Sequence, residues 1–254
     1  MTTAQLKSFL DQKVEQYNTS EFLDTDPVQI PHNFSAKNDI EIAGFLTATI
    51  AWGNRKSIIT NATRMMQGMD NAPYDFIVNH QESDLAVFND FVHRTFKAID
   101  LHYFIQALHH IYKNHDGLEA VISAYSTPTS TQTGITALKT LFFELPHPAR
   151  TTKHLADPST GSAAKRINMY LRWMVRKDPF GVDFGIWGTV KPSQLSCPLD
   201  VHSGRVARKL GLLTRKQNDA KALVELDLAL RKLDANDPVK YDFALFGLGV
   251  FEDF

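Results

Sequence analysis

Residues 150–216 decide the fold. They contain two short segments, Gly161-Ser-Ala-Ala-Lys165-Arg-Ile-Asn168 and Pro198-Leu-Asp200-Val-His202-Ser-Gly-Arg205-Val206. The first segment indicates a loop that opens into a helix over 162–176, with a lysine in the first turns of that helix. The second segment indicates another loop, whose aspartate begins a second helix.

The same stretch concentrates positive charge. It holds 13 Lys and Arg residues against 4 Asp residues, a local balance of +9. The whole chain has 27 basic and 28 acidic residues, so everything outside the stretch sums to −10. This distribution is expected when one face of a protein meets a polyanion and the rest does not.

Length and composition indicate an ordinary globular protein. A chain of 254 residues is long enough for one large or two small domains with a sizeable core. No apolar run reaches the roughly 18 residues of a membrane span, and the first residues lack the apolar core of a signal peptide, so we expect a cytoplasmic protein with no membrane partner. A single cysteine, Cys197, excludes an internal disulfide and any all-cysteine zinc or iron–sulfur site.

Helical periodicity recurs along the chain, without β alternation and without an internal repeat. Ser57 is predicted to cap one of the helices, and Ser126–Thr133 to form a loop. The sequence predicts an all-α fold of about a dozen helices, the clearest covering 2–17, 40–52, 58–69, 134–145, 162–176, 219–233 and 238–251.

The lysine helix has a defined buried stripe and a defined start. Ser159 or Thr160 can accept hydrogen bonds from its first backbone N–H groups. Its apolar stripe comprises Ile167, Tyr170, Leu171 and Met174. An uncharged lysine amine is a nucleophile, although a solvated surface lysine is the commoner case. Arg172 and Arg176 extend this basic segment into a ridge that could meet a polyanion. The alternative is that they belong to an ordinary charged face of the helix.

The aspartate turn has two compatible interpretations. Asp200 is well placed as a helix N-cap, a role worth about 1 kcal/mol. A carboxylate at that position can also activate a nucleophile or stabilise a cation that develops on a sugar. Val201, Val206, Leu210 and Leu212 can line the following helix, and Gly211 can end it. His202, Arg205 and Arg208 on this helix could meet phosphates.

Together the two segments resemble the helix-hairpin-helix DNA glycosylases. The family pattern Gly-x-Gly-x-Lys-x-x-Asn is matched at Gly161, Lys165 and Asn168, and the pattern Val-Asp-Thr-His-x-x-Arg-Val is matched closely by Leu199–Val206. The resemblance covers most of residues 38–250. More narrowly, the chain resembles an uncharacterised bacterial family distantly related to these glycosylases.

Two departures from the family pattern matter. The hairpin Leu-Pro-Gly-Val-Gly is replaced by Leu155-Ala-Asp-Pro-Ser-Thr-Gly-Ser, and Ala163 stands at the second glycine. The separation of Lys165 and Asp200 is 35 residues (200 − 165), longer than in many members. A long spacer also occurs in the archaeal 8-oxoguanine glycosylase branch, which the chain resembles in this respect.

The resemblance implies a two-lobed helical fold with a degenerate helix-hairpin-helix element, residues 1–37 and 215–254 forming one lobe and residues 38–214 the other. It implies catalytic roles for Lys165 and Asp200, a monomer, double-stranded DNA with a damaged base as partner, and no metal or cofactor. The implied DNA contacts are Asn54, Arg55, Gly161, Ser162, Arg166, Asn168, His202 and Arg205. Trp52 and Trp187 are the candidates for stacking on a flipped base. The alternative for each is that it packs in the protein core.

Three functions follow as hypotheses. The first is a base-excision DNA glycosylase, with or without AP lyase activity, acting on a damaged base such as an oxidised purine. The second is a non-catalytic protein that binds DNA structures on the same fold. The third is a metal-dependent phosphohydrolase that uses the region His109–Asp116, where helical spacing places His109, Tyr112 and Asp116 on one face and directs His110 elsewhere.

Overall fold

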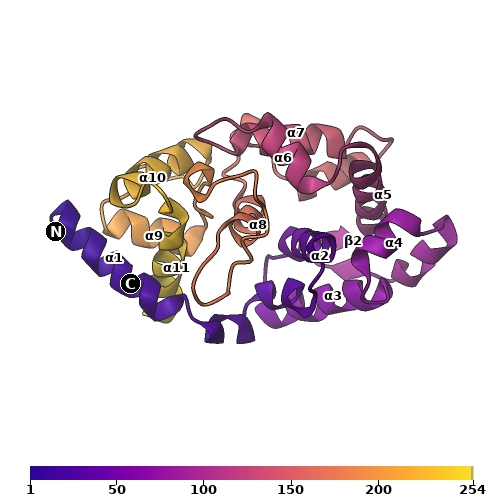
Figure 1. Ribbon diagram of the computed structural model, residues 1–254, viewed down its shortest axis with the longest axis horizontal. Helices are drawn as coiled ribbons and strands as arrows, with labels where there is room; N and C mark the ends of the chain where they lie inside the picture. The colour runs from indigo at the N-terminus through magenta and orange to yellow at the C-terminus, as the bar shows by residue number, and fades with distance from the viewer. Residues whose placement is uncertain (253) are drawn as a thin grey trace. The chain divides into compact units, whose positions relative to one another are not determined.

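The computed structural model describes residues 1–252 and 254, and within them the fold is all-α, as predicted (Figure 1). Its α-helices are α1 (Thr3–Tyr17), α2 (Lys37–Thr49), α3 (Arg55–Gly68), α4 (Pro73–Asn79), α5 (Ala98–Asn114), α6 (Leu118–Tyr125), α7 (Gln132–Phe142), α8 (Lys165–Val175), α9 (Val201–Lys209), α10 (Ala220–Leu233) and α11 (Tyr241–Phe251). None of the described helices is both long enough and apolar enough to cross a bilayer.

Short elements connect these helices. The 3₁₀ helices are η1 (Ser20–Asp24), η2 (Pro27–Gln29), η3 (Pro31–Asn33), η4 (Glu82–Phe88), η5 (Ala149–His154), η6 (Pro158–Thr160), η7 (Pro192–Gln194) and η8 (Pro238–Lys240). A hairpin of two residues a side, β1 (Val92–His93) and β2 (Phe96–Lys97), lies before α5 and was not predicted. Its strands are too short for alternation to be detected in the sequence.

The chain packs into two compact units. The terminal unit comprises Met1–Phe22, Ser126–Thr133 and Asp157–Phe254, and the central unit comprises Leu23–Tyr125 and Gly134–Ala156. These boundaries differ from the expected lobes, because Lys165 and Asp200 belong to the unit that contains both termini. The reason is a shared core, in which Leu199 and Val206 from the basic stretch are buried with Leu10, Leu226 and Leu245.

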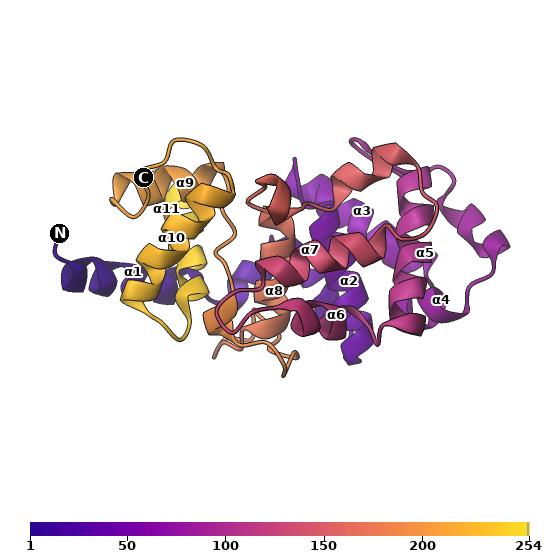
Figure 2. The same ribbon diagram turned by 90° about the horizontal axis from the view of Figure 1, so that it is seen from above.

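Helix α11 is the centre of the terminal unit and packs against both α1 and α9 (Figures 1 and 2). Two glycines permit the close approach. A Cβ atom at Gly247 would lie 2.2 Å from Cδ2 of Tyr17 on α1, and one at Gly249 would lie 3.1 Å from Cβ of His202 on α9. The ring of Tyr17 also stacks on Phe251, with ring centroids 5.6 Å apart.

Aromatic rings hold the central unit together. Phe45 of α2 lies 6.2 Å from Phe104 of α5 and 5.6 Å from Phe142 of α7, and the latter two rings are 4.8 Å apart, measured between centroids. The hydroxyl of Tyr103 donates to the carbonyl of Phe142 at 2.7 Å, which ties α5 to the end of α7. Residues 40–49 of α2 are all buried, as its apolar sequence predicted.

Some helix boundaries differ from the predicted ones for local reasons. Helix α3 begins at Arg55, because the side chain of Asn54, and not Ser57, accepts from the helical N–H groups; its acceptor reaches the N–H of Ser57 at 3.1 Å. Asp200 caps α9 as predicted, and Gly211 follows its end with φ +73°. Val201 was expected to line the helix, but it is 75% exposed, because it lies with His202 on the solvent side of the first turn of α9, opposite the buried Ser203.

Candidate active site

Lys165 and Asp200 meet in the terminal unit, although 35 residues separate them in the sequence. Lys165 is the first residue of α8, and its Nζ lies 3.9 Å from Oδ2 of Asp200, which precedes α9. Both side chains are partly accessible, at 29% and 26% of their full exposure. An amine and a carboxylate that face each other and can still be reached from solvent form a candidate reaction centre.

The two oxygens of Asp200 have different partners. Oδ1 accepts from the backbone N–H groups of His202 and Ser203, at 2.9 and 3.0 Å. The Ser203 hydroxyl accepts from the backbone N–H of Asp200 at 2.9 Å, which completes a capping box. The capping bonds therefore fix the carboxylate through Oδ1 and leave Oδ2 directed toward Lys165.

A turn with two left-handed residues delivers Lys165. Gly161 has φ +94° and Ala164 has φ +46°, and the Oγ of Ser162 accepts from the N–H of Ala164 at 3.1 Å. The carbonyl of Gly161 accepts from the N–H of Ala220 at 3.0 Å, which anchors the turn to α10. The left-handed conformation of an alanine costs about 1–2 kcal/mol relative to the right-handed one. The hydrogen bonds of the turn hold Ala164 in this conformation.

The start of this helix differs from the prediction. Ser159 and Thr160 do not cap it, because both close a 3₁₀ turn on Asp157: the N–H of Ser159 donates to Oδ1 of Asp157 at 2.9 Å, and the hydroxyl of Thr160 donates to its carbonyl at 2.9 Å. In the fully described stretch 143–164, 3₁₀ helices and not an α-helix precede the turn. Of the two helices expected around the hairpin, the second is present as α8, and 3₁₀ helices stand in place of the first.

Asn168 supports this turn from inside. Its side chain is fully buried, its Nδ2 donates to the carbonyl of Ala163 at 3.0 Å, and its Oδ1 accepts from Nε2 of Gln132 at 2.9 Å. Asn168 was predicted to contact DNA. Its burial makes it a residue that positions the backbone before Lys165 instead.

Arg172 and Arg176 do not form a surface ridge. They are only 3% and 4% exposed and are surrounded by carboxylates. Arg172 contacts Asp242 and, at 3.2 Å, Asp183; Arg176 contacts Asp183 at 3.1 Å and Asp237 at 2.8 Å. A buried charge needs such partners, because desolvation would otherwise cost several kcal/mol. These two arginines therefore stabilise the interior and cannot reach a polyanion.

Asp242 is a buried acid near the pair that the sequence did not identify. It lies in the first turn of α11, and its Oδ1 is 3.9 Å from Sγ of Cys197. Burial raises the pKa of Asp242 to about 6, while the positive charges of Arg172 and Lys165 oppose that rise. The available signal was a carboxylate within the otherwise apolar helix Tyr241–Phe251.

The remaining predicted residues of the terminal unit have mixed positions. Arg166 is half-buried, and burial lowers the pKa of Arg166 to about 10. His202 and Arg205 are exposed, and Arg205 donates to the carbonyl of Gly249 at 2.8 Å. Trp187 is only 3% exposed and meets the ring of Tyr170 edge-on, so it is a core residue and not a surface for stacking a base.

Three of the predicted DNA contacts lie in the central unit: Trp52, Asn54 and Arg55. Trp52 is partly exposed, and its ring stacks on that of His154 at 6.0 Å between centroids. Asn54 is exposed and caps α3, and Arg55 begins that helix. The turn that contains them was expected to contact DNA, and it is at the surface of its unit.

The predicted metal ligands of the central unit are not brought together. Nδ1 of His109 lies 2.8 Å from the carbonyl of Ile77, and the hydroxyl of Tyr112 donates to Glu41 at 2.7 Å. Asp116 follows the helix in a left-handed conformation with φ +57°. Within the described part of the chain, His110, which the helical spacing directed elsewhere, belongs instead to a cluster that could hold a metal ion.

Comparison with known proteins identifies a family. Residues 26–251 match the model of the family described as "Protein of unknown function (DUF2400)". No curated protein and no solved structure is similar enough to the chain to count as a match.

Proposed function

Since the chain belongs to the DUF2400 family, a family of unknown function, we propose its activity from the site itself: base excision from double-stranded DNA by a glycosylase with AP lyase activity. The observation that carries the proposal is the approach of Lys165 Nζ to Asp200 Oδ2 at 3.9 Å, with both groups accessible. The resemblance to the helix-hairpin-helix glycosylases assigns catalytic roles to the same two positions.

The two groups divide the chemistry. The amine of Lys165 attacks C1′ of the deoxyribose, the N-glycosidic bond breaks, and the base leaves with the bonding electron pair and takes up a proton. Asp200 Oδ2 accepts the proton released by the attacking amine and stabilises the positive charge that develops on the sugar. The lone pair of the lysine nitrogen then forms a C=N bond to C1′, and O4′ leaves with the C1′–O4′ bonding pair and takes the proton held by Asp200. The product is a protonated Schiff base between the lysine and the opened sugar.

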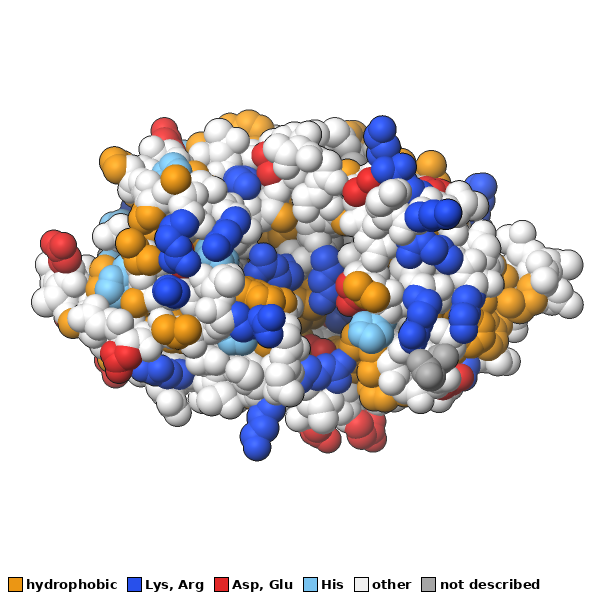
Figure 3. Space-filling model, turned by 180° about the vertical axis from the view of Figure 1, so that it is seen from behind, with side chains coloured by type: hydrophobic (Ala, Val, Ile, Leu, Met, Phe, Trp, Pro, Cys, Tyr) orange, Lys and Arg blue, Asp and Glu red, His pale blue; other side chains and the backbone are white. Residues whose placement is uncertain are grey.

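The substrate must reach the pair as an extruded nucleotide, because C1′ of a stacked nucleotide cannot approach a side chain at a helix start. Lys and Arg side chains are drawn in blue in Figure 3, and those exposed on the terminal unit, such as Arg205 and Lys209, can attract a phosphate backbone. The long spacer between Lys165 and Asp200 resembles that of the archaeal 8-oxoguanine glycosylase branch, and this resemblance favours an oxidised purine as the base.

Trapping with borohydride tests the proposal. The purified protein is mixed with duplexes that carry 8-oxoguanine, uracil or an abasic site, and borohydride reduces any Schiff base to a stable adduct. We expect an adduct with wild type that Lys165→Gln abolishes and that Lys153→Gln, a lysine of the central unit, leaves unchanged.

The same experiment separates the alternative functions. An adduct that persists in Lys165→Gln would refute the role of this lysine. Salt-sensitive binding of DNA without adduct or base release, and unchanged in Lys165→Gln, would replace the proposal with a non-catalytic binder of DNA structures. If the wild type neither binds nor modifies any of these duplexes, DNA is not its substrate.

A further inference from the structure

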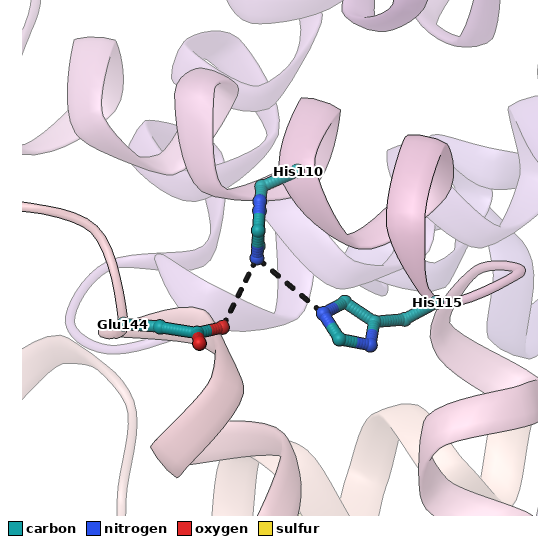
Figure 4. Close-up of side chains that lie close together, drawn as sticks. All are labelled: His110, His115 and Glu144. Carbon is teal, nitrogen blue, oxygen red and sulfur yellow. Dashed lines mark hydrogen bonds and ion pairs between the residues drawn. The ribbon is translucent and has the colours of Figure 1, made fainter.

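A cluster of two histidines and a glutamate lies in the central unit, away in sequence from Lys165 and Asp200 (Figure 4). His110 comes from the last turns of α5, His115 directly follows that helix, and Glu144 follows α7. One ligand atom from each lies within 4.8 Å of the other two. In Figure 4 the ring of His110 points toward both His115 and Glu144.

The distances in the cluster match those between ligands of one metal ion. Nε2 of His110 is 3.1 Å from Oε2 of Glu144 and 3.4 Å from Nε2 of His115. Two ligand atoms bound tetrahedrally to Zn²⁺ at about 2.0–2.1 Å are about 3.3 Å apart. Two edges of a tetrahedron are therefore already present without movement of the backbone.

Protein atoms alone do not satisfy this cluster well. The Nδ2 group of Asn114 donates to the carbonyl of His110 at 3.1 Å and faces Nδ1 of the same residue at 3.0 Å. A ring nitrogen carries at most one hydrogen atom, so at most one N–H at Nε2 of His110 serves both the glutamate and the other histidine. A cation at the centre of the three atoms would accept a lone pair from each of them at once.

The core of the unit fixes the backbone segments that carry the three side chains. Helices α5 and α7 are held together by the contact of Phe104 with Phe142 and by the hydrogen bond of Tyr103 described above. The turn after His115 is set by Asp116 and Gly117, with φ +57° and +91°. The ligand atoms thus sit on packed elements, which is the arrangement that favours metal affinity.

We propose that His110, His115 and Glu144 bind one divalent cation of the zinc class. Two imidazole nitrogens and one carboxylate oxygen suit Zn²⁺ and its neighbours better than Mg²⁺ or Ca²⁺, which take mainly oxygen ligands. Three side chains leave the fourth tetrahedral position for water. Binding through Nε2 leaves Nδ1 of His110 beside the carboxamide of Asn114, which is an outer contact of the site.

Calorimetric titration of the metal-free, untagged full chain with Zn²⁺ tests the site. We expect one equivalent to bind to wild type. His110→Ala and His115→Ala should each lower the affinity by more than the roughly 10–100-fold that the loss of an outer contact costs. Glu144→Gln should weaken binding while preserving the fold, because this side chain is 58% exposed.

Matched controls come from the same unit. His147→Ala removes an exposed histidine three residues after Glu144, and Glu82→Gln removes an exposed carboxylate; both should bind Zn²⁺ as wild type does. Circular dichroism of each metal-free variant checks its fold. The proposal is overturned if wild type binds no Zn²⁺ at millimolar concentration, or if folded His110→Ala and Glu144→Gln bind it as tightly as wild type.

Discussion

Asp200 offers the sharpest test, because its two oxygens have separate roles. Oδ1 accepts from two backbone N–H groups at the start of α9, and Oδ2 faces Nζ of Lys165 at 3.9 Å. Asp200→Ala removes both oxygens. Asp200→Asn keeps an acceptor for the cap, since asparagine caps helices as well as aspartate does, but removes the negative charge beside the lysine.

The expected magnitudes differ for stability and for catalysis. Loss of the cap in Asp200→Ala should lower the free energy of unfolding by about 1–2 kcal/mol. For a chain of this size that corresponds to a melting temperature lower by about 2–8 °C. Asp200→Asn should stay within about 0.5 kcal/mol of wild type. Both variants should release the base about 10²–10⁴-fold more slowly, the usual effect of losing a general base.

Thermal denaturation and single-turnover base release measure the two effects on the same preparations. Asp26→Ala is the control for loss of an aspartate cap elsewhere: Oδ1 of Asp26 accepts from the N–H of Val28 at 3.0 Å in the central unit, and the base release of this variant should equal that of wild type. Equal melting temperatures for the two Asp200 variants would refute the capping argument. Base release by Asp200→Asn within threefold of wild type would refute the role of Oδ2.

Two further predictions concern the terminal unit. Gly247→Ala should lower the free energy of unfolding by about 1–3 kcal/mol, because the added Cβ would lie 2.2 Å from the ring of Tyr17. Tyr17→Ala should therefore cost less stability in the Gly247→Ala background than in wild type. Urea denaturation of wild type, the two single variants and the double variant measures this coupling, and strictly additive free energies would contradict the clash. Asp227→Asn should change the pH dependence of stability, because burial raises the pKa of Asp227 from 3.8 to about 6. The folded state therefore binds more protons than the unfolded state between about pH 4 and 6, and the wild type loses up to about 3 kcal/mol of stability as the pH rises through this window. The Asp227→Asn variant keeps an acceptor for the N–H of Cys197 and avoids this loss. It should therefore be more stable than wild type at pH 7.5 and equally stable at pH 4. A difference in stability that does not depend on pH would contradict the raised pKa as its cause.

Local features of the fold were predictable because neighbouring residues determine them. The apolar stripe Ile167, Tyr170, Leu171 and Met174 is buried as its spacing predicted. Asp200 forms the predicted cap, since a side chain beside free N–H groups needs no distant partner. The cap of α8 was mispredicted for the same kind of reason: Asp157, two residues before Ser159, offers a nearer partner.

Contacts between distant segments were not predictable from one sequence. The roles of Asn168 and Asp242 depend on Gln132 and Arg172, at separations of 36 and 70 residues. The cluster of His110, His115 and Glu144 requires the end of α7 to meet the end of α5. Helical spacing on α5 alone therefore selected His109, whose ring turns to the carbonyl of Ile77 instead.

The charge of the basic stretch illustrates why sequence balance and surface charge differ. Along the chain the stretch sums to +9, yet acids from outside it lie beside its arginines: Asp219 pairs with Arg215, Asp237 with Arg176, and Asp242 with Arg172. Carboxylates that lie further along the chain thus offset part of the charge that suggested a polyanion. The proposal of DNA chemistry consequently depends less on that count than on the approach of one accessible amine to one accessible carboxylate. This is why substitutions at Lys165 and Asp200, and not a general dependence on salt, decide between an enzyme and a binding protein.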